Sequence, residues 1–215
     1  MDELKLATLL CSRLCHDLVS PIGALNNGVE VLEEETSASI RKEALALLSE
    51  SARAAIGKLL FFRVAFGVAT GFGSEISLRE VKQAASGLFA NSRIRLDWSP
   101  EHDANAQLAK PAAKLLLNFV MIAGEALIRG GSIAPRFETA GAATTIAVTA
   151  KGQGVQLHES IATALAGRLR AEDIEVRTAQ PWYACQIANQ CGGHIDVAHS
   201  NPETIVFSTK IQISG

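Results

Sequence analysis

The sequence has few aromatic residues and little excess charge, and both shortages limit what the protein can be. Aromatic residues make up 5% of the 215 residues. The 20 Lys and Arg are nearly balanced by 22 Asp and Glu, which leaves a net charge of −2. A chain without a strong positive field is poorly suited to bind nucleic-acid phosphates or an anionic membrane surface. We therefore expect neither nucleic acid nor a membrane as its partner.

Long hydrophobic runs and a secretory signal are also lacking. The apolar stretch 115–123 is interrupted by Asn118 and is far shorter than the ~18–20 residues of a membrane span. The chain begins with an acidic Met-Asp-Glu instead of the basic start of a secretory signal. These features predict a cytoplasmic protein.

The four cysteines are too few to predict a disulfide framework. In a reducing compartment such residues usually behave as small buried apolar side chains. The alternative is a metal site built from the one cluster, Cys11, Cys15 and His16. We favour the first interpretation and predict no metal bound by this chain.

Helical periodicity dominates the first 67 residues. Apolar residues recur every three or four positions from Glu3 to Glu35, with a gap at Gly28, and a second such pattern runs from Ile40 to Phe66 after a polar break. We predict an antiparallel helical hairpin over residues 1–67. Two helices alone have too little depth to bury both apolar stripes, so we expect two copies to form a dimeric four-helix bundle.

Beyond the hairpin the periodicity changes, after a predicted linker over residues 68–77 that is rich in glycine and small side chains. The rest of the chain, residues 78–215, is predicted to be an α+β domain with a mixed or antiparallel sheet covered by helices on one face. Helices are expected at 78–90, 109–128, 160–168 and 182–191, and strands at 94–98, 132–139, 143–150, 194–199 and 204–213.

His16 is the candidate for chemistry in the first helix. At 100° per residue it points away from the apolar seam and into solvent. A neutral imidazole, whose ordinary pKa is about 6.5, is a competent nitrogen nucleophile, and Asp17 beside it can orient the ring and stabilise charge during attack on phosphorus. Pro21 frees the carbonyl of Asp17 and should bend the helix. The alternative is an ordinary surface histidine.

The residues around His16 resemble a known motif. The run 16–22, His-Asp-Leu-Val-Ser-Pro-Ile, resembles the phosphoacceptor signature His-Asp/Glu-Leu-x-x-Pro-Leu of histidine-kinase dimerisation helices. Residues 115–127 resemble the asparagine box of the kinase ATP-binding domain, 149–155 its first glycine box, and 187–195 the segment that ends it. The resemblance implies a histidine-kinase-type α/β sandwich after the hairpin.

Three departures make the implied nucleotide site degenerate. Ile122 stands where the family's magnesium-coordinating asparagine would fall, and Ala150 stands where the adenine-binding aspartate would fall. Neither side chain can supply the oxygen ligand or the acceptor that is needed. The second glycine-rich loop is missing from residues 178–183. The combination of a phosphoacceptor helix and a degenerate ATP site resembles the ChpT-type histidine phosphotransferases. We therefore expect this chain to bind no cofactor.

This resemblance implies a bacterial phosphorelay. His16 would take a phosphoryl group from the receiver domain of a hybrid histidine kinase and yield it to response-regulator receiver domains, whose acidic pockets would supply the Mg²⁺. Ser20 stands four residues after His16, where active kinases often carry an Asn or Thr that serves phosphatase activity. This departure leaves phosphatase activity open. The predicted partner-binding residues lie along the same helix: Arg13, Ser20, Ile22, Gly23 and Asn27.

Two alternatives remain. One is a non-catalytic dimeric adaptor or inhibitor of a kinase or receiver, in which His16 is incidental. The other is an active kinase, which requires ATP binding.

Overall fold

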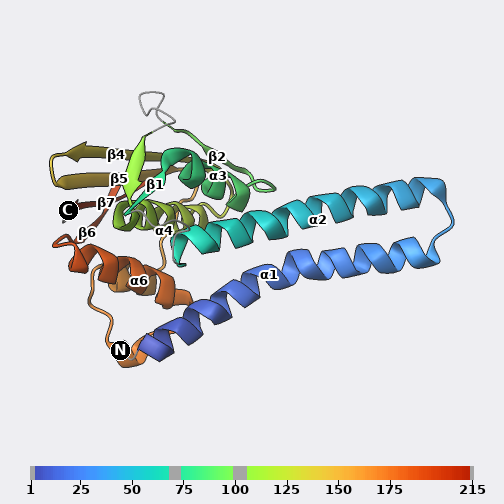
Figure 1. The fold of residues 1–215 in the computed structure, drawn as a ribbon, viewed down its shortest axis with the longest axis horizontal. Helices are drawn as coiled ribbons and strands as arrows, with labels where there is room; N and C mark the ends of the chain where they lie inside the picture. The colour runs from blue at the N-terminus through green and yellow to red at the C-terminus, as the bar shows by residue number, and fades with distance from the viewer. Residues whose placement is uncertain (1–2, 68–73, 99–105, 214–215) are drawn as a thin grey trace.

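Two long antiparallel helices form an arm that extends from the rest of the molecule (Figure 1). The computed structural model describes residues 3–67, 74–98 and 106–213. Helix α1 (Glu3–Glu34) and helix α2 (Ala38–Ala65) are joined by a short connection, which confirms the predicted helical hairpin. Within the described residues, no helix is both long and apolar enough to cross a membrane.

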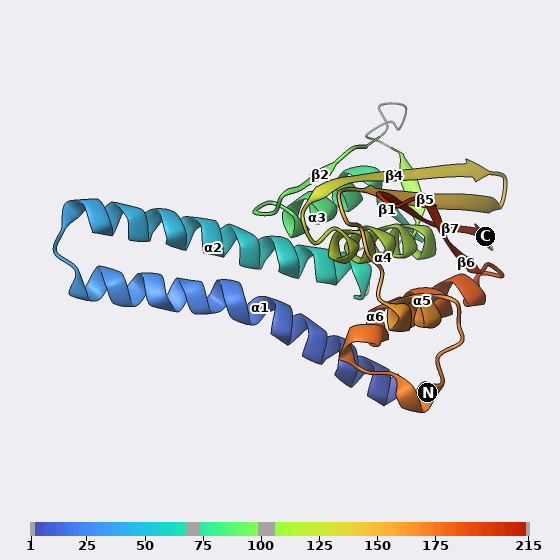
Figure 2. The same ribbon diagram turned by 180° about the vertical axis from the view of Figure 1, so that it is seen from behind.

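The gap in the apolar seam of α1 is the place where the two helices approach each other closely. Gly28 is buried, and a Cβ atom added there would lie 2.8 Å from Cγ of Leu48 on α2. The first part of α1, however, diverges from α2 and lies beside α6 (Val176–Gln190) (Figures 1 and 2). The predicted seam is therefore wrong at its start, where Leu4 is 72% exposed and Cys11 is exposed.

A five-stranded mixed sheet forms one layer of the second unit, as expected. Its strand order is β2-β4-β5-β7-β6. The pair β2–β4 is parallel and the other neighbours are antiparallel. The bounds are Ile94–Leu96 for β2, Gly131–Ala140 for β4, Ala143–Lys151 for β5, Ile195–Asn201 for β6 and Thr204–Gln212 for β7.

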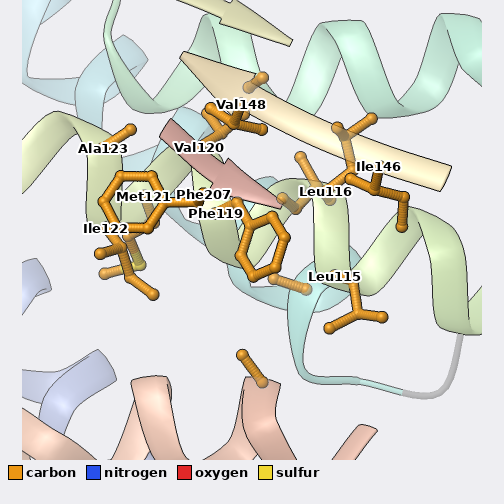
Figure 3. Close-up of a cluster of buried hydrophobic side chains, with 14 of the residues drawn as sticks. Leu115, Leu116, Phe119, Val120, Met121, Ile122, Ala123, Ile146, Val148 and Phe207 are labelled. Atoms are coloured by element: carbon orange, nitrogen blue, oxygen red, sulfur yellow. The ribbon is translucent and has the colours of Figure 1, made fainter. Parts of the chain in front are cut away.

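Helix α4 (Lys110–Ala126) is the centre of the core, because it lies between the sheet and α6 (Figures 1 and 2). Figure 3 shows side chains of α4 gathered with Ile146 and Val148 of β5 in one cluster, in which the ring centre of Phe119 on α4 lies 6.3 Å from that of Phe207 on β7. A helix covered on both sides must be apolar nearly all round, as 110–126 is. The remaining helices are α3 (Leu78–Leu88), α5 (Glu159–Leu165) and a short 3₁₀ helix, Ala171–Asp173.

The predicted linker needs a correction. Residues 68–73 lie outside the described residues, but Glu75–Ser77 form strand β1, which pairs antiparallel with β3 (Gln107–Ala109). Ile76 is buried in this pairing. The second unit therefore includes residues that the composition assigned to the linker, because three residues are too short a run for strand periodicity to emerge.

Helix α6 begins six residues earlier than predicted, at Val176 instead of residue 182. A reciprocal cap starts it: the backbone N–H of Glu175 donates to the hydroxyl of Thr178, and the Glu175 side chain accepts from the Thr178 backbone. Pro181, which directly precedes the predicted start, lies inside the helix. The capping box is the local sequence signal that marks this start.

The hairpin and the second unit share one hydrophobic core. Phe61, Phe62 and Ala65 at the end of α2 are buried in the same cluster as the α4 side chains. Helix α2 also crosses α3 at two glycines, and a Cβ atom on Gly57 would lie 2.3 Å from the carbonyl oxygen of Gly87. This packing fixes the second unit against the part of the hairpin that carries His16.

Candidate functional site

His16 projects from the side of α1 that faces solvent, as its position in the helical pattern predicts. Its side chain is 84% exposed. Its Nδ1 atom lies 3.3 Å from Oδ1 of Asp17, the following residue. A nitrogen that faces a carboxylate is the one that carries the proton in the neutral ring, so the other nitrogen, Nε2, holds the lone pair that a nucleophile needs.

The carboxylate of Asp17 is shared between two partners. Its second oxygen, Oδ2, accepts a hydrogen bond from Nε of Arg13 at 3.0 Å. The Asp17 side chain is 20% exposed, so it sits beside the histidine in a position partly shielded from water. The residue that sequence reasoning assigned to orienting His16 is therefore itself held in place.

Arg13 lies in a different environment from the one expected. The sequence suggested that it faces a partner, but its side chain is only 13% exposed and is bound within the chain. It donates to Asp17 and, through its NH2 group, to Oε1 of Glu125 on α4. Burial alone would lower the pKa of the Arg13 guanidinium, but the charges of Glu125 and Asp17 outweigh burial and place this pKa above its ordinary value.

A lysine of α2 holds the backbone of Asp17 in place. Pro21 has no N–H to donate to the Asp17 carbonyl, and the Nζ of Lys58 donates to that oxygen at 2.7 Å. Figure 1 shows α1 bent in this region, which confirms the predicted bend. Lys58 thus replaces the missing helical hydrogen bond and ties the two helices together next to His16.

Sequence reasoning missed both Lys58 and Glu125. Lys58 carried a usable signal, because a freed carbonyl needs a donor and Asp17 and Lys58 lie roughly symmetrically about Ser37 in the hairpin connection. Glu125 carried none, since only the packing of α1 on α6 and of α2 on α4 brings it to Arg13.

The other predicted partner-binding residues fall into two groups. Ser20, Gly23 and Asn27 are exposed and lie within about 60° of His16 around the helix. Ile22 is exposed too, but it belongs to an apolar stripe with Val19 and Val29 on the adjacent side of α1.

A cleft of about 410 Å³ opens next to Ser20, between the hairpin and the end of α3. Its lining includes Lys58, Gly87 and Asn91. The cleft therefore adjoins the exposed face that carries His16.

Two key positions of the region that resembles a nucleotide site are occupied by core side chains. Ile122 and Ala150 are both fully buried in the hydrophobic cluster. Asn118, one turn earlier on α4, is also fully buried and accepts a hydrogen bond from Nε2 of Gln180 at 3.0 Å. In the part of the chain that the structure describes, no three His, Cys, Asp or Glu side chains gather in a way that could hold a metal ion.

Comparisons with known proteins agree with these features. Residues 78–203 match the family model of the histidine phosphotransferase C-terminal domain. The chain is 36% identical over 210 residues to protein phosphotransferase ChpT of Brucella abortus (strain 2308), which covers 98% of this chain and 97% of that protein. A solved structure of a bacterial phosphotransferase has a TM-score of 0.83 at 36% identity and 97% coverage of each chain.

A weaker similarity is to the histidine kinase AdeS of Acinetobacter baumannii, with a TM-score of 0.43 at 12% identity over 93% of this chain and 98% of that one.

The fold and the matched family model define a histidine phosphotransferase, and the chain belongs to that family. Within that family, the similarity to ChpT extends over 98% of this chain, so this protein is a phosphotransferase of the ChpT type. The family resemblance predicted from the motif at residues 16–22 and from the degenerate second unit is confirmed.

The bond from Lys58 to the Asp17 carbonyl can be tested by a double-mutant cycle with Pro21. Lys58→Met keeps most of the packing but leaves the freed carbonyl without its donor, so we expect a loss of about 1–2 kcal/mol in the free energy of unfolding. In a Pro21→Ala background the new N–H can satisfy this carbonyl, and the same change should cost less than about 0.5 kcal/mol. Chemical denaturation measures all four variants; equal costs in both backgrounds would contradict the assignment.

Proposed function

We propose that His16 is the phosphoacceptor of a relay between receiver domains. It accepts the phosphoryl group from an aspartyl phosphate of the receiver of a hybrid histidine kinase and delivers it to the aspartate of a response-regulator receiver. The observation that carries the proposal is the exposed imidazole whose Nδ1 faces the Asp17 carboxylate. This arrangement leaves Nε2 as the nucleophile on the solvent side of α1.

The chemistry of each transfer follows from this geometry. The lone pair of Nε2 attacks phosphorus, the bond from phosphorus to the aspartyl oxygen breaks, and the receiver aspartate leaves as a carboxylate. The ring then carries a positive charge with its proton still on Nδ1, and the adjacent Asp17 carboxylate stabilises it. Transfer to the second receiver is the reverse process. In-line positioning and charge neutralisation supply most of the rate enhancement in such transfers.

The phosphoryl group enters from a protein partner and not from ATP in this proposal. The support is the core packing of Ile122 and Ala150, which leaves apolar, fully buried side chains where a nucleotide would need polar ones. The chain therefore binds no cofactor, and the receiver's acidic pocket supplies Mg²⁺ for each transfer.

Receiver docking uses the face of α1 around His16. Ser20, Gly23 and Asn27 continue this face along the helix, and Gly23 has open space around its Cα. A helix of the receiver can approach the backbone closely there, because Gly23 has no side chain and nothing lies within 4 Å of a Cβ atom added to it. The cleft beside Ser20 gives the docked domain a second point of contact.

Replacement of His16 by alanine tests the relay. Receiver domains phosphorylated with a small phosphodonor are mixed with the protein, and the acid-labile label on the protein is followed over time. We expect His16→Ala to abolish the label and the onward transfer, while receiver binding measured by calorimetry stays within about twofold of wild type because the other docking residues, Ser20, Gly23 and Asn27, are unchanged.

The same assay separates the alternatives. A non-catalytic adaptor or inhibitor would retain its effect on the partner after His16→Ala. An active kinase would label itself from ATP and Mg²⁺ alone. Either result would contradict the proposal.

The hairpin is further proposed to form a homodimer with a four-helix bundle. Each helix carries an exposed apolar stripe that the single chain does not cover: Val19, Ile22 and Val29 on α1, and Leu45, Ile56 and Leu59 on α2. Members of each stripe lie within about 80° of one another around their helix, which is the width of a coiled-coil seam. Pairing with a second copy would bury both stripes.

Two leucines of α2, two residues apart in the sequence, provide a matched test of the dimer. Leu45 lies in the proposed stripe, and Leu47 is similarly exposed but lies about 160° away around the helix. We expect Leu45→Glu to weaken self-association by about 100-fold, because the dimer would bury two unpaired charges. Leu47→Glu should leave it unchanged. Sedimentation equilibrium distinguishes the two; a monomeric wild type, or equal effects of both changes, would contradict the assigned interface.

A further inference from the structure

Glu125 connects the second unit to the chemistry of the hairpin. It lies near the end of α4, within the stretch that resembles an asparagine box, and its carboxylate accepts from Arg13 of α1. The two residues are far apart in the sequence, and they meet because α1 packs against α6 while α4 packs against both α6 and α2. Glu125 is 32% exposed and lines a cleft of about 420 Å³ at the end of α4.

Arg13 transmits this contact to Asp17 because its guanidinium is bound on two sides. Its Nε donates to Asp17 at 3.0 Å and its NH2 donates to Glu125. A planar guanidinium has a fixed geometry between its donors, so a carboxylate bound at one edge limits where the other edge can point. With 13% of the side chain exposed, water competes little for these donors.

Asp17 carries the constraint to the reacting ring. One carboxylate oxygen is taken by Arg13, and the other is left facing Nδ1 of His16 at 3.3 Å. Lys58 fixes the backbone of the same residue at 2.7 Å. Rotation of the carboxylate would break the bond to Arg13, so Asp17 holds one oxygen toward the imidazole and favours the tautomer in which Nε2 is the nucleophile.

We propose that Glu125 is a positioning residue for phosphotransfer: through Arg13 it orients Asp17, which sets the tautomer and the orientation of the His16 ring. The inference rests on the proposed role of His16. It gives the degenerate second unit a direct part in the reaction, because α4 supplies the carboxylate that anchors the chain of contacts.

Glu125→Gln is the central variant, since it removes the negative charge at constant size. We expect the single-turnover rate of transfer at saturating phosphorylated receiver to fall about tenfold. In ¹⁵N-histidine NMR spectra of the full-length protein, the His16 signals should shift away from the Nδ1–H tautomer. Receiver affinity should stay at the wild-type value, and Glu125→Asp should restore most of the rate.

Glu159→Gln is the matched control, because Glu159 is an exposed acid that lines the same cleft. It should change neither the rate nor the tautomer. An unchanged rate and tautomer in Glu125→Gln would overturn the inference, and so would a rate loss explained by weaker receiver binding alone. If Glu125→Gln lowers stability, the NMR spectrum of its folded fraction and the Glu125→Asp variant still decide the question.

Failure of the proposed function is recognised separately. If His16→Ala still transfers the phosphoryl group, the relay through His16 is wrong whatever Glu125 does. If His16→Ala is inactive and Glu125→Gln behaves as wild type, only the role of Glu125 is wrong.

Discussion

The ion pair network centred on Arg13 is the interaction on which the site depends. One guanidinium joins a carboxylate of the hairpin, Asp17, to a carboxylate of the second unit, Glu125, in a largely buried position. A buried arginine without these partners would carry a large desolvation cost, so removal of either acid leaves a charge poorly compensated. The network therefore links the orientation of the region around His16 to the position of α4. The bend at Pro21 and the hydrogen bond from Lys58 to the Asp17 carbonyl set the backbone conformation of α1 at this point.

Hydrophobic packing stabilises the second unit at two positions of its nucleotide-site motifs. Ile122 and Ala150 contribute apolar area to the core at the positions where the family motif has polar groups. Each fully buried aliphatic side chain adds about 1.5–3 kcal/mol relative to an exposed one. A domain stabilised in this way is a scaffold that presents Glu125 to Arg13 of the hairpin.

Local patterns in the sequence predicted the features that depend on short-range physics. The hairpin, the exposure of His16, the mixed sheet and the freed carbonyl at Asp17 all follow from periodicity or from the missing N–H of Pro21. The start of α6 was misplaced because the Glu175–Thr178 cap was not recognised, and β1 was too short to show alternation. Glu125 and the burial of Arg13 could not be predicted, since both depend on how α1 packs against α6 and how α2 packs against α4, and no local pattern encodes these contacts.

The central claim is that the phosphoryl group resides on Nε2 of His16. Phosphorus NMR of the ¹⁵N-histidine-labelled protein, loaded from a phosphorylated receiver, tests this directly through the coupling between phosphorus and the bonded nitrogen. The account predicts one phosphoramidate signal, coupled to Nε2 of His16 and lost on acidification. A phosphoryl group on Nδ1, on another residue, or on no residue of this chain would contradict it.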